Sequence, residues 1–125
     1  MAGKTYQLAV SRDEDVLIII ITGQLMKENA AQAANEIARE VYEIIRRDNP
    51  QRLLVDCRAL QGRLGIVETY FHSRKREEFL RVKTAVVDVV ENESYYSFHE
   101  ITATNAGVLI KYFNDYDAAK AWLRQ

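Results

Sequence analysis

The six consecutive apolar residues 16–21 place the strongest constraint on how this chain can fold. A run without a polar position is apolar on both faces, which is typical of a strand buried inside a sheet. It is far too short to cross a bilayer, so we expect no membrane span. The run therefore predicts a central strand.

The segments that flank this run predict a hairpin and a helix. Residues 6–10 alternate large apolar with smaller or polar side chains, which is typical of an edge strand, and the polar residues 11–15 would form the hairpin loop. After Thr22-Gly23, apolar residues at spacings of three and four predict a long helix. Asp48-Asn49-Pro50 would end it. The stripe consists of Ala30, Ala34, Ile37, Val41 and Ile44.

The rest of the chain continues to alternate strand and helix. Strands are predicted at residues 52–57, 84–90 and 108–113, where apolar and β-branched residues concentrate. Helices are predicted at residues 64–80, at residues 95–106 and after an Asn114-Asp115 cap. The buried side of the last helix would consist of Ala118, Ala119, Trp122 and Leu123. We therefore expect an α/β fold with a five-stranded, mainly parallel sheet, an antiparallel N-terminal edge strand and four helices.

Composition fits one domain over residues 1–125. A chain of 125 residues that is 48% hydrophobic and 28% charged is typical of a single soluble globular unit. Its only cysteine, Cys57, cannot form an internal disulfide, and the first residues lead into no signal-peptide core, so a cytoplasmic location is expected. The formal net charge of −1 argues against a dedicated nucleic-acid binder.

Polar residues follow the third predicted strand directly, as Asp56, Cys57 and Arg58. In open α/β sheets, ligands bind at the carboxyl ends of the strands, so this triplet lies where a site is expected. Asp56 also has a structural interpretation, as an acceptor for amides of the following turn. Cys57 alternates with Val55 and Leu53, so we expect it to pack as a small apolar side chain under a helix.

Catalytic chemistry is difficult to build from these residues. A thiol nucleophile at Cys57 would need a histidine base, and spacing brings neither His72 nor His99 to it. No metal-ligand spacing, phosphate loop or dinucleotide motif occurs. Phosphoryl acceptance by Asp56, as in receiver domains, would need an acidic pair after a first parallel strand, whereas the acidic residues 13–15 precede the central strand. We therefore expect no catalytic residue and no cofactor.

The middle of the chain is basic, because residues 58–83 carry a net charge of +4 and the remainder carries −5. A solvated helix face explains most such runs. The alternative is that Arg58 and Arg63, beside a helix start flanked by Gly62 and Gly65, bind a small anionic ligand or an acidic partner surface. Tyr95 and Tyr96 would point about 100° apart on a helix, so both can hardly be buried. An exposed Tyr96 is therefore a further candidate for a protein contact or an apolar ligand.

Several segments resemble the SpoIIAA-like branch of the STAS domain superfamily, whose founding members are anti-sigma-factor antagonists. They are residues 53–62 (Leu-Leu-Val-Asp-Cys-Arg-Ala-Leu-Gln-Gly), Phe98-His99-Glu100 with Asn105-Ala106-Gly107, and residues 112–123. The turn at residues 23–28 is similar too, with Met26 where that family usually has threonine. The resemblance implies a parallel sheet whose consecutive strands are neighbours.

The antagonists carry a switch serine at the start of the helix after the third strand. Residues 58–65 contain no serine or threonine, and Thr69 and Ser73 lie inside the predicted helix, so no phosphosite is transferred to this chain. The resemblance implies a regulatory protein-binding module of the bacterial cytoplasm that lacks this switch.

Three alternatives stay open. The first is a binder of an anionic or lipid-like small molecule, with an apolar cavity near Phe71, Tyr95 and Phe98. The second is an enzyme that uses Asp56 and Cys57. Self-association is the third, through an exposed strand edge or the alanine-rich start of the first long helix.

Overall fold

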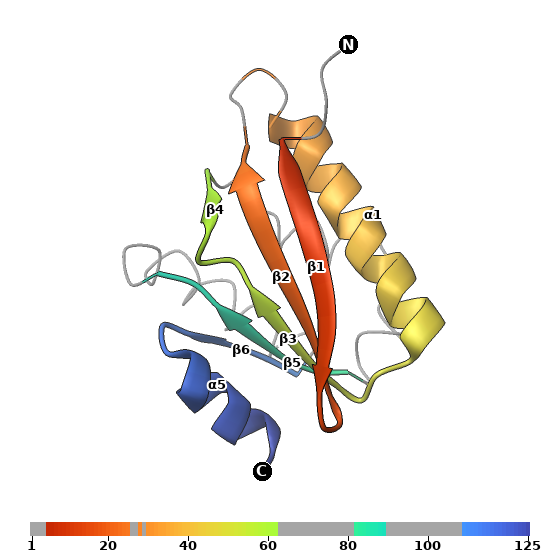
Figure 1. Cartoon of the computed structure of the whole chain (residues 1–125), viewed down its shortest axis with the longest axis vertical. Helices are drawn as coiled ribbons and strands as arrows, with labels where there is room; N and C mark the ends of the chain where they lie inside the picture. The colour runs from red at the N-terminus through yellow and green to blue at the C-terminus, as the bar shows by residue number, and fades with distance from the viewer. Residues whose placement is uncertain (1–4, 26–27, 29, 63–81, 90–108) are drawn as a thin grey trace.

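β2 (Val16–Gln24) is an interior strand of a six-stranded sheet (Figure 1). The computed structural model describes residues 5–25, 28, 30–62, 82–89 and 109–125. β1 (Tyr6–Asp13) pairs antiparallel with β2 along its whole length. The other main strands run parallel in the order β1-β2-β3-β5-β6, and they are β3 (Arg52–Asp56), β5 (Lys83–Val87) and β6 (Ile110–Phe113). The expected α/β architecture, with an antiparallel N-terminal edge strand and neighbouring consecutive strands, is confirmed.

Two helices cover opposite faces of this sheet (Figure 1). α1 (Ala30–Asp48) ends where Asn49 adopts a positive φ of 47°, one residue before the proline, as the sequence predicted. Of the predicted stripe, Ile37, Val41 and Ile44 are buried, while the side chains of its two alanines lie outside the described part. The helices predicted at residues 64–80 and 95–106 also lie outside the described residues.

α5 (Tyr116–Leu123) begins behind the predicted cap. The Asp115 carboxylate accepts from the backbone amides of Asp117 (2.9 Å) and Ala118 (3.3 Å), which satisfies two amides that the helix itself leaves unpaired. Ala119 and Leu123 are buried as expected, but Ala118 is exposed and Trp122 is only half-buried. A helix of two turns buries one narrow stripe at a spacing of four, so the two neighbours of that stripe stay at its margin.

Each face of the sheet has its own core. On the α1 side, Leu17, Ile19 and Leu53 pack with the buried stripe of the helix. On the α5 side, Val16, Ile18 and Leu54 pack with Ala119 and Leu123. Side chains of residues 16–21 alternate between the two cores, which explains why this run of β2 has no polar position.

The first hairpin is tighter than the sequence predicted. Residues 11–13 belong to β1, and the loop is reduced to Glu14-Asp15, with Glu14 at a φ of 58°. The polar side chains in this segment are compatible with a strand because β1 lies at the sheet edge, where they can reach water.

The strand ends also differ from the expected ones. β2 continues through Gly23, β3 ends at Asp56, and β5 ends at Val87. At Gly23 the φ is 117°, and an added Cβ would lie 2.2 Å from the carbonyl oxygen of Thr5. Glycine is required here because the backbone of β1 passes so closely, and it does not mark the end of the strand.

A sixth strand was not predicted. β4 (Leu60–Gln61) pairs in parallel with the end of β2, Leu60 beside Gly23 and Gln61 beside Gln24. The count of five strands was therefore wrong. A strand of two residues is too short to show a periodic pattern. Its one indication in the sequence was Leu60, an apolar residue within the turn that the structure shows to be buried.

Candidate functional site

Strands β2, β3, β5 and β6 end at one edge of the sheet, here called the carboxyl edge. Three acidic side chains lie at these ends: Asp56 ends β3, Asp88 follows β5 and Asp115 caps α5 after β6. Neighbouring parallel strands bring these residues together although they are far apart in the sequence. This is the edge at which α/β sheets bind ligands, so its groups define the candidate site.

Asp56 and Arg58 form the central pair of the candidate site. Asp56 is 6% exposed. Its Oδ1 accepts from the backbone amide of Arg58 (3.1 Å) and from Arg58 Nε (3.0 Å), and its Oδ2 accepts from Arg58 Nη2 (2.8 Å). The side-chain hydrogen bond that Arg58 donates to Asp56 is the main cause of the raised pKa of Arg58. The turn-amide acceptor role expected for Asp56 is therefore present, and the guanidinium adds a second, bidentate bond.

The Arg58 guanidinium also lies over the ring of Tyr116, 5.3 Å from its centroid. Tyr116 is the first residue of α5, so this contact joins the turn after β3 to the beginning of the last helix. Contacts of a cation with an aromatic face stabilise such an arrangement modestly at an exposed site. Because the Arg58 side chain is 44% exposed, its outer side remains accessible to a partner.

The Arg58 charge is thus matched inside the protein by a buried carboxylate. Arg63 and Gly65, which were expected to complete an anion site with it, lie outside the described residues, as do Tyr96, Phe71, Tyr95 and Phe98. The structure therefore brings Asp56 and Arg58 together and leaves the wider site a prediction.

Cys57 lies under the α1 layer, as expected for a small apolar side chain. It is 1% exposed and belongs to the core cluster that contains Ile37 and Val41. Its backbone amide donates to the carbonyl of Val87 (2.8 Å), which continues the pairing of β3 with β5. The thiol of Cys57 is therefore part of the hydrophobic core.

The turn after Arg58 is fixed by bonds to the end of β2. Gly23 N donates to the Ala59 carbonyl (3.3 Å), and Leu25 N donates to the Gln61 carbonyl (2.9 Å). Gly62 has a φ of 84°, and a Cβ there would lie 3.0 Å from the Leu25 carbonyl oxygen. The exposed residues Ala59 and Gln61 are therefore presented on an ordered backbone.

Asp88 was not singled out in the sequence, although it lies at the same edge. It is 2% exposed, its Oδ1 accepts from the amide of Val89 (2.7 Å), and its own amide donates to the Phe113 carbonyl (2.9 Å). In the sequence, Asp88 is a single acidic residue inside the apolar run 84–90. It follows the end of β5, whereas the prediction placed it within the strand.

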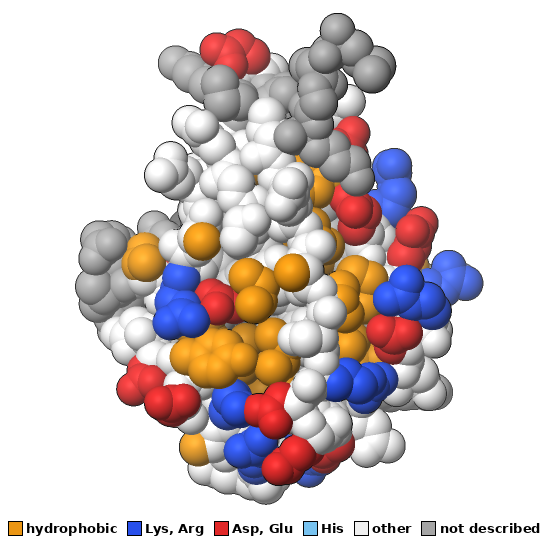
Figure 2. Space-filling view, viewed as in Figure 1, with side chains coloured by type: hydrophobic (Ala, Val, Ile, Leu, Met, Phe, Trp, Pro, Cys, Tyr) orange, Lys and Arg blue, Asp and Glu red, His pale blue; other side chains and the backbone are white. Residues whose placement is uncertain are grey.

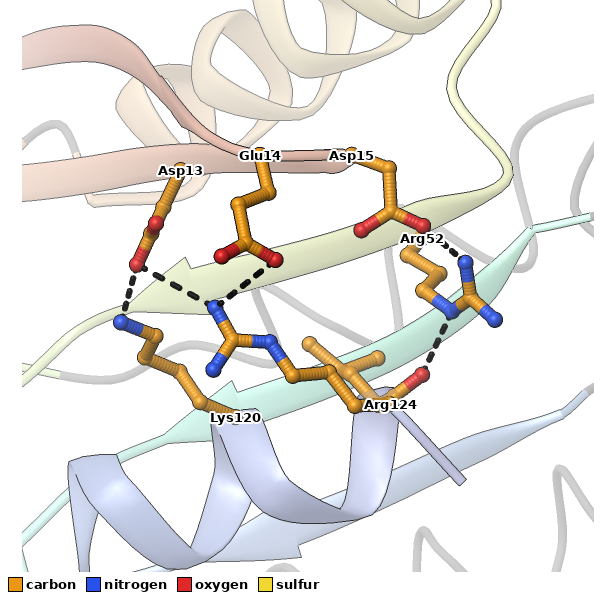
Figure 3. A network of polar contacts seen from close by, with 7 residues as sticks. Asp13, Glu14, Asp15, Arg52, Lys120 and Arg124 are labelled. Carbon is orange, nitrogen blue, oxygen red and sulfur yellow. Dashed lines mark hydrogen bonds and ion pairs between the residues drawn. The ribbon is translucent and has the colours of Figure 1, made fainter.

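A second polar cluster lies at the opposite, amino edge of the sheet (Figure 3). Lys120 binds Asp13, and Arg124 bridges Asp13 (3.5 Å) and Glu14 (3.8 Å). Arg52 binds Asp15 and donates through Nε to the Leu123 carbonyl (2.6 Å). These contacts tie the first hairpin turn to the last helix, and we call them the amino-edge clamp.

The position of this clamp bears on the receiver interpretation. In a receiver the acidic pair shares a metal ion with the phosphate-accepting aspartate, whereas Asp13, Glu14 and Asp15 lie at the sheet edge opposite to Asp56. Within the described ranges, no group of three or more histidine, cysteine, aspartate or glutamate side chains is arranged to hold a metal ion.

Of the helices in those ranges, none has the length and apolar character needed to cross a membrane.

The fold is shared with solved structures. No protein-family model and no curated protein matched the sequence. An anti-sigma factor antagonist from Mycobacterium paratuberculosis superposes with a TM-score of 0.67 over 99% of this chain and 98% of that one, at 14% sequence identity. This chain has a SpoIIAA-like fold of the STAS type.

A second structure agrees with this conclusion. An uncharacterised protein with a SpoIIAA-like fold from Shewanella loihica PV-4 superposes with a TM-score of 0.58 at 17% identity, covering 98% of each chain. The fold implied by the sequence resemblance is therefore confirmed. Because identity with both structures is this low, the likeness concerns the arrangement of the chain and not its ligands.

Proposed function

We propose that this chain is a regulatory protein-binding module of the bacterial cytoplasm that has no catalytic activity of its own. The proposal rests on the contacts and the burial of residues 56–58. The carboxylate and the guanidinium bind each other, and the thiol between them is buried in the core. The three groups that could have supported chemistry are thus used by the fold.

The same residues support a binding surface. The turn after Arg58 exposes Arg58, Ala59 and Gln61, and its backbone carbonyls accept hydrogen bonds from amides at the end of β2. A rigid, partly charged surface loses little conformational entropy when it docks, which favours recognition of another protein. The fold shared with an anti-sigma factor antagonist is consistent with this function.

The proposed module would not use the phosphoserine switch of the anti-sigma-factor antagonists that the sequence resembles. The described part of the turn, residues 58–62, has no hydroxyl side chain, and it folds back as β4. A small anion at Arg58 is less favoured than a protein. Such a ligand would compete with the Asp56 carboxylate, to which Arg58 donates two hydrogen bonds.

Affinity capture from the native cell extract tests this function with two matched variants. Ala59→Arg places a long cation on the exposed turn and keeps its backbone bonds, while Ala121→Arg makes the same change on the exposed side of α5. We expect a specific protein that is retained by the wild type and by Ala121→Arg and lost by Ala59→Arg. Equal thermal unfolding of the two variants would show that both are folded. If the two variants retain the same proteins, the proposed surface is wrong.

A further inference from the structure

The outer edge of β1 has a pattern that fits a second copy of itself. Gln24 N donates to the Thr5 carbonyl (2.7 Å), so Thr5 and Gln24 form a hydrogen-bonded pair of the antiparallel ladder. Such pairs alternate along an antiparallel ladder. Given the register from Tyr6 opposite Gly23 to Asp13 opposite Val16, the backbone groups of Leu8, Val10 and Arg12 point away from β2.

Nothing in the described ranges lies beyond this edge. The strand order ends at β1, and within those ranges no hydrogen bond is made by the outward backbone groups of Leu8, Val10 or Arg12. Long edge strands usually carry features that prevent pairing, such as a proline, a bulge or short length. β1 is eight residues long, has no proline and pairs without a bulge.

The side chains along this edge are apolar in the middle. Val10 is 42% exposed, which is unusual for a large apolar residue in this chain, and Leu8 is only partly covered by the α1-side core. Figure 2 shows apolar side chains in the seam between β1 and α1, bordered on the α1 side by alternating charged side chains. Such a seam loses exposed apolar area when a matching strand is placed beside it.

The two ends of the strand carry opposite charge on that same face. The Tyr6 hydroxyl donates to Glu36 (3.4 Å) and to Glu40, so one end lies under two carboxylates of α1. At the other end lies the exposed Arg12, which makes a long contact with the Asp48 carbonyl (3.5 Å) and interacts electrostatically with the Asp48 carboxylate. An antiparallel copy of the strand would place each basic end beside the acidic end of its neighbour.

We propose that two copies of this chain pair through antiparallel β1 strands, with Ala9 opposite Ala9 on the two-fold axis. In this register Leu8 and Val10 of the two copies form hydrogen-bonded pairs, and Arg12 of one copy lies beside Tyr6 and Glu36 of the other. A register with Val10 on the axis would instead place Arg12 opposite Leu8. Charge complementarity selects the first register. The dimer uses the β1 edge and leaves the carboxyl edge accessible, so it is independent of the proposed protein-binding function.

Cross-linking tests the register directly. Residues opposite each other in a non-hydrogen-bonded pair have Cα atoms about 4.5 Å apart, within the range that a disulfide spans. We expect Ala9→Cys to form a disulfide-linked dimer under mild oxidation. Ser11→Cys is the matched control, because Ser11 would face Gln7 of the second copy, and it should remain uncross-linked. The wild type should also remain uncross-linked, since Cys57 is buried.

Charge reversal tests the interface in solution by sedimentation velocity. We expect the wild type to be a dimer, Arg12→Glu and Glu36→Arg each to weaken dimerisation at least tenfold, and an equimolar mixture of the two variants to form a heterodimer. Lys111→Glu, an equal change on β6 at the far side of the sheet, should leave the dimer intact. A wild type that is monomeric up to about 1 mM would overturn the proposal, as would cross-linking of Ser11→Cys but not of Ala9→Cys.

Discussion

The Arg58 guanidinium donates two parallel hydrogen bonds to the carboxylate of Asp56, two residues before it in the chain. Both carboxylate oxygens are therefore occupied by a side chain that remains 44% exposed. The pair fixes the start of the turn after β3, because the same carboxylate also accepts from the Arg58 backbone amide.

Removal of this guanidinium should destabilise the fold. In Arg58→Ala, the buried Asp56 carboxylate keeps only the backbone amide of residue 58 as a hydrogen-bond donor among the described residues, and we expect a loss of about 1–2 kcal/mol in the free energy of unfolding. The value is below that of a fully buried charged bond because solvent screens the exposed arginine. Urea unfolding measures it. Arg58→Lys should recover only part of the loss, because lysine cannot form the bidentate pair. A loss below about 0.3 kcal/mol would contradict the structural role.

Gly23 should tolerate substitution less well than Gly62. A Cβ at Gly23 would lie 2.2 Å from the Thr5 carbonyl oxygen and 2.6 Å from the Tyr6 Cα, and the φ of 117° is unfavourable for other residues. We expect Gly23→Ala to cost more than about 2 kcal/mol in thermal or urea unfolding. Gly62→Ala, whose nearest backbone atom would be 3.0 Å away, should cost about 1 kcal/mol. The opposite ranking would argue against the close approach of β1 to β2 at this point.

The amino-edge clamp should make stability sensitive to acid. The hydrogen bond from Lys120 lowers the pKa of Asp13. Because the folded pKa is below the unfolded value of about 3.9, the contribution is complete above that pH and is lost as the pH falls through the folded pKa. Asp13→Asn should therefore weaken the loss of stability below about pH 4, measured by urea unfolding at several pH values. Glu43→Gln, on the exposed side of α1, should leave this pH dependence unchanged.

The same contact predicts that stability is also sensitive to base. Asp13 raises the pKa of Lys120, so the stabilisation is present below the unfolded lysine value of about 10.4 and is lost as the pH rises through the folded pKa. High salt should reduce both effects, because the residues of the clamp lie at the surface. A pH profile of Asp13→Asn that superposes on that of the wild type would contradict the clamp.

Trp122 should contribute less than its size suggests. Full burial, which the sequence predicted, would make Trp122→Ala cost about 3–5 kcal/mol, but the side chain is half-buried. Its ring lies 5.7 Å from that of Phe113, with the Lys83 ammonium 4.6 Å from its centroid. We expect a cost of about 1–3 kcal/mol, below that of Leu123→Ala, since Leu123 is completely buried. Urea unfolding of the two variants, followed by circular dichroism, gives the ranking, and a larger loss at Trp122 would contradict it.

Local patterns were sufficient to predict the five main strands of the sheet and the helices α1 and α5. The apolar run in β2, the spacing of three and four in α1 and the Asp115 cap each depend on a few neighbouring residues. The limits of the strands were less predictable, because Ser11 and Arg12 look like loop residues and only the pairing of an edge strand accommodates them.

The candidate site was only partly predictable. An acidic residue at the end of a strand indicated the role of Asp56 as an acceptor for the next turn. The contact of Arg58 with the Tyr116 ring could not be inferred, because Tyr116 comes from a helix far along the chain. β4 was missed for a similar reason, since parallel pairing with the end of β2 is a long-range contact with no local signature.

The amino-edge clamp has a consequence for the order in which the protein assembles during synthesis. Its acidic residues come from the first hairpin, and its cations include Lys120 and Arg124 from the last helix. Lys120 and Asp13 are 107 positions apart, and contacts over such a long loop form late. A nascent chain that has left the ribosome only up to β6 would lack Ala119 and Leu123 in the core on the α5 side of the sheet, and this core would be completed only when α5 follows.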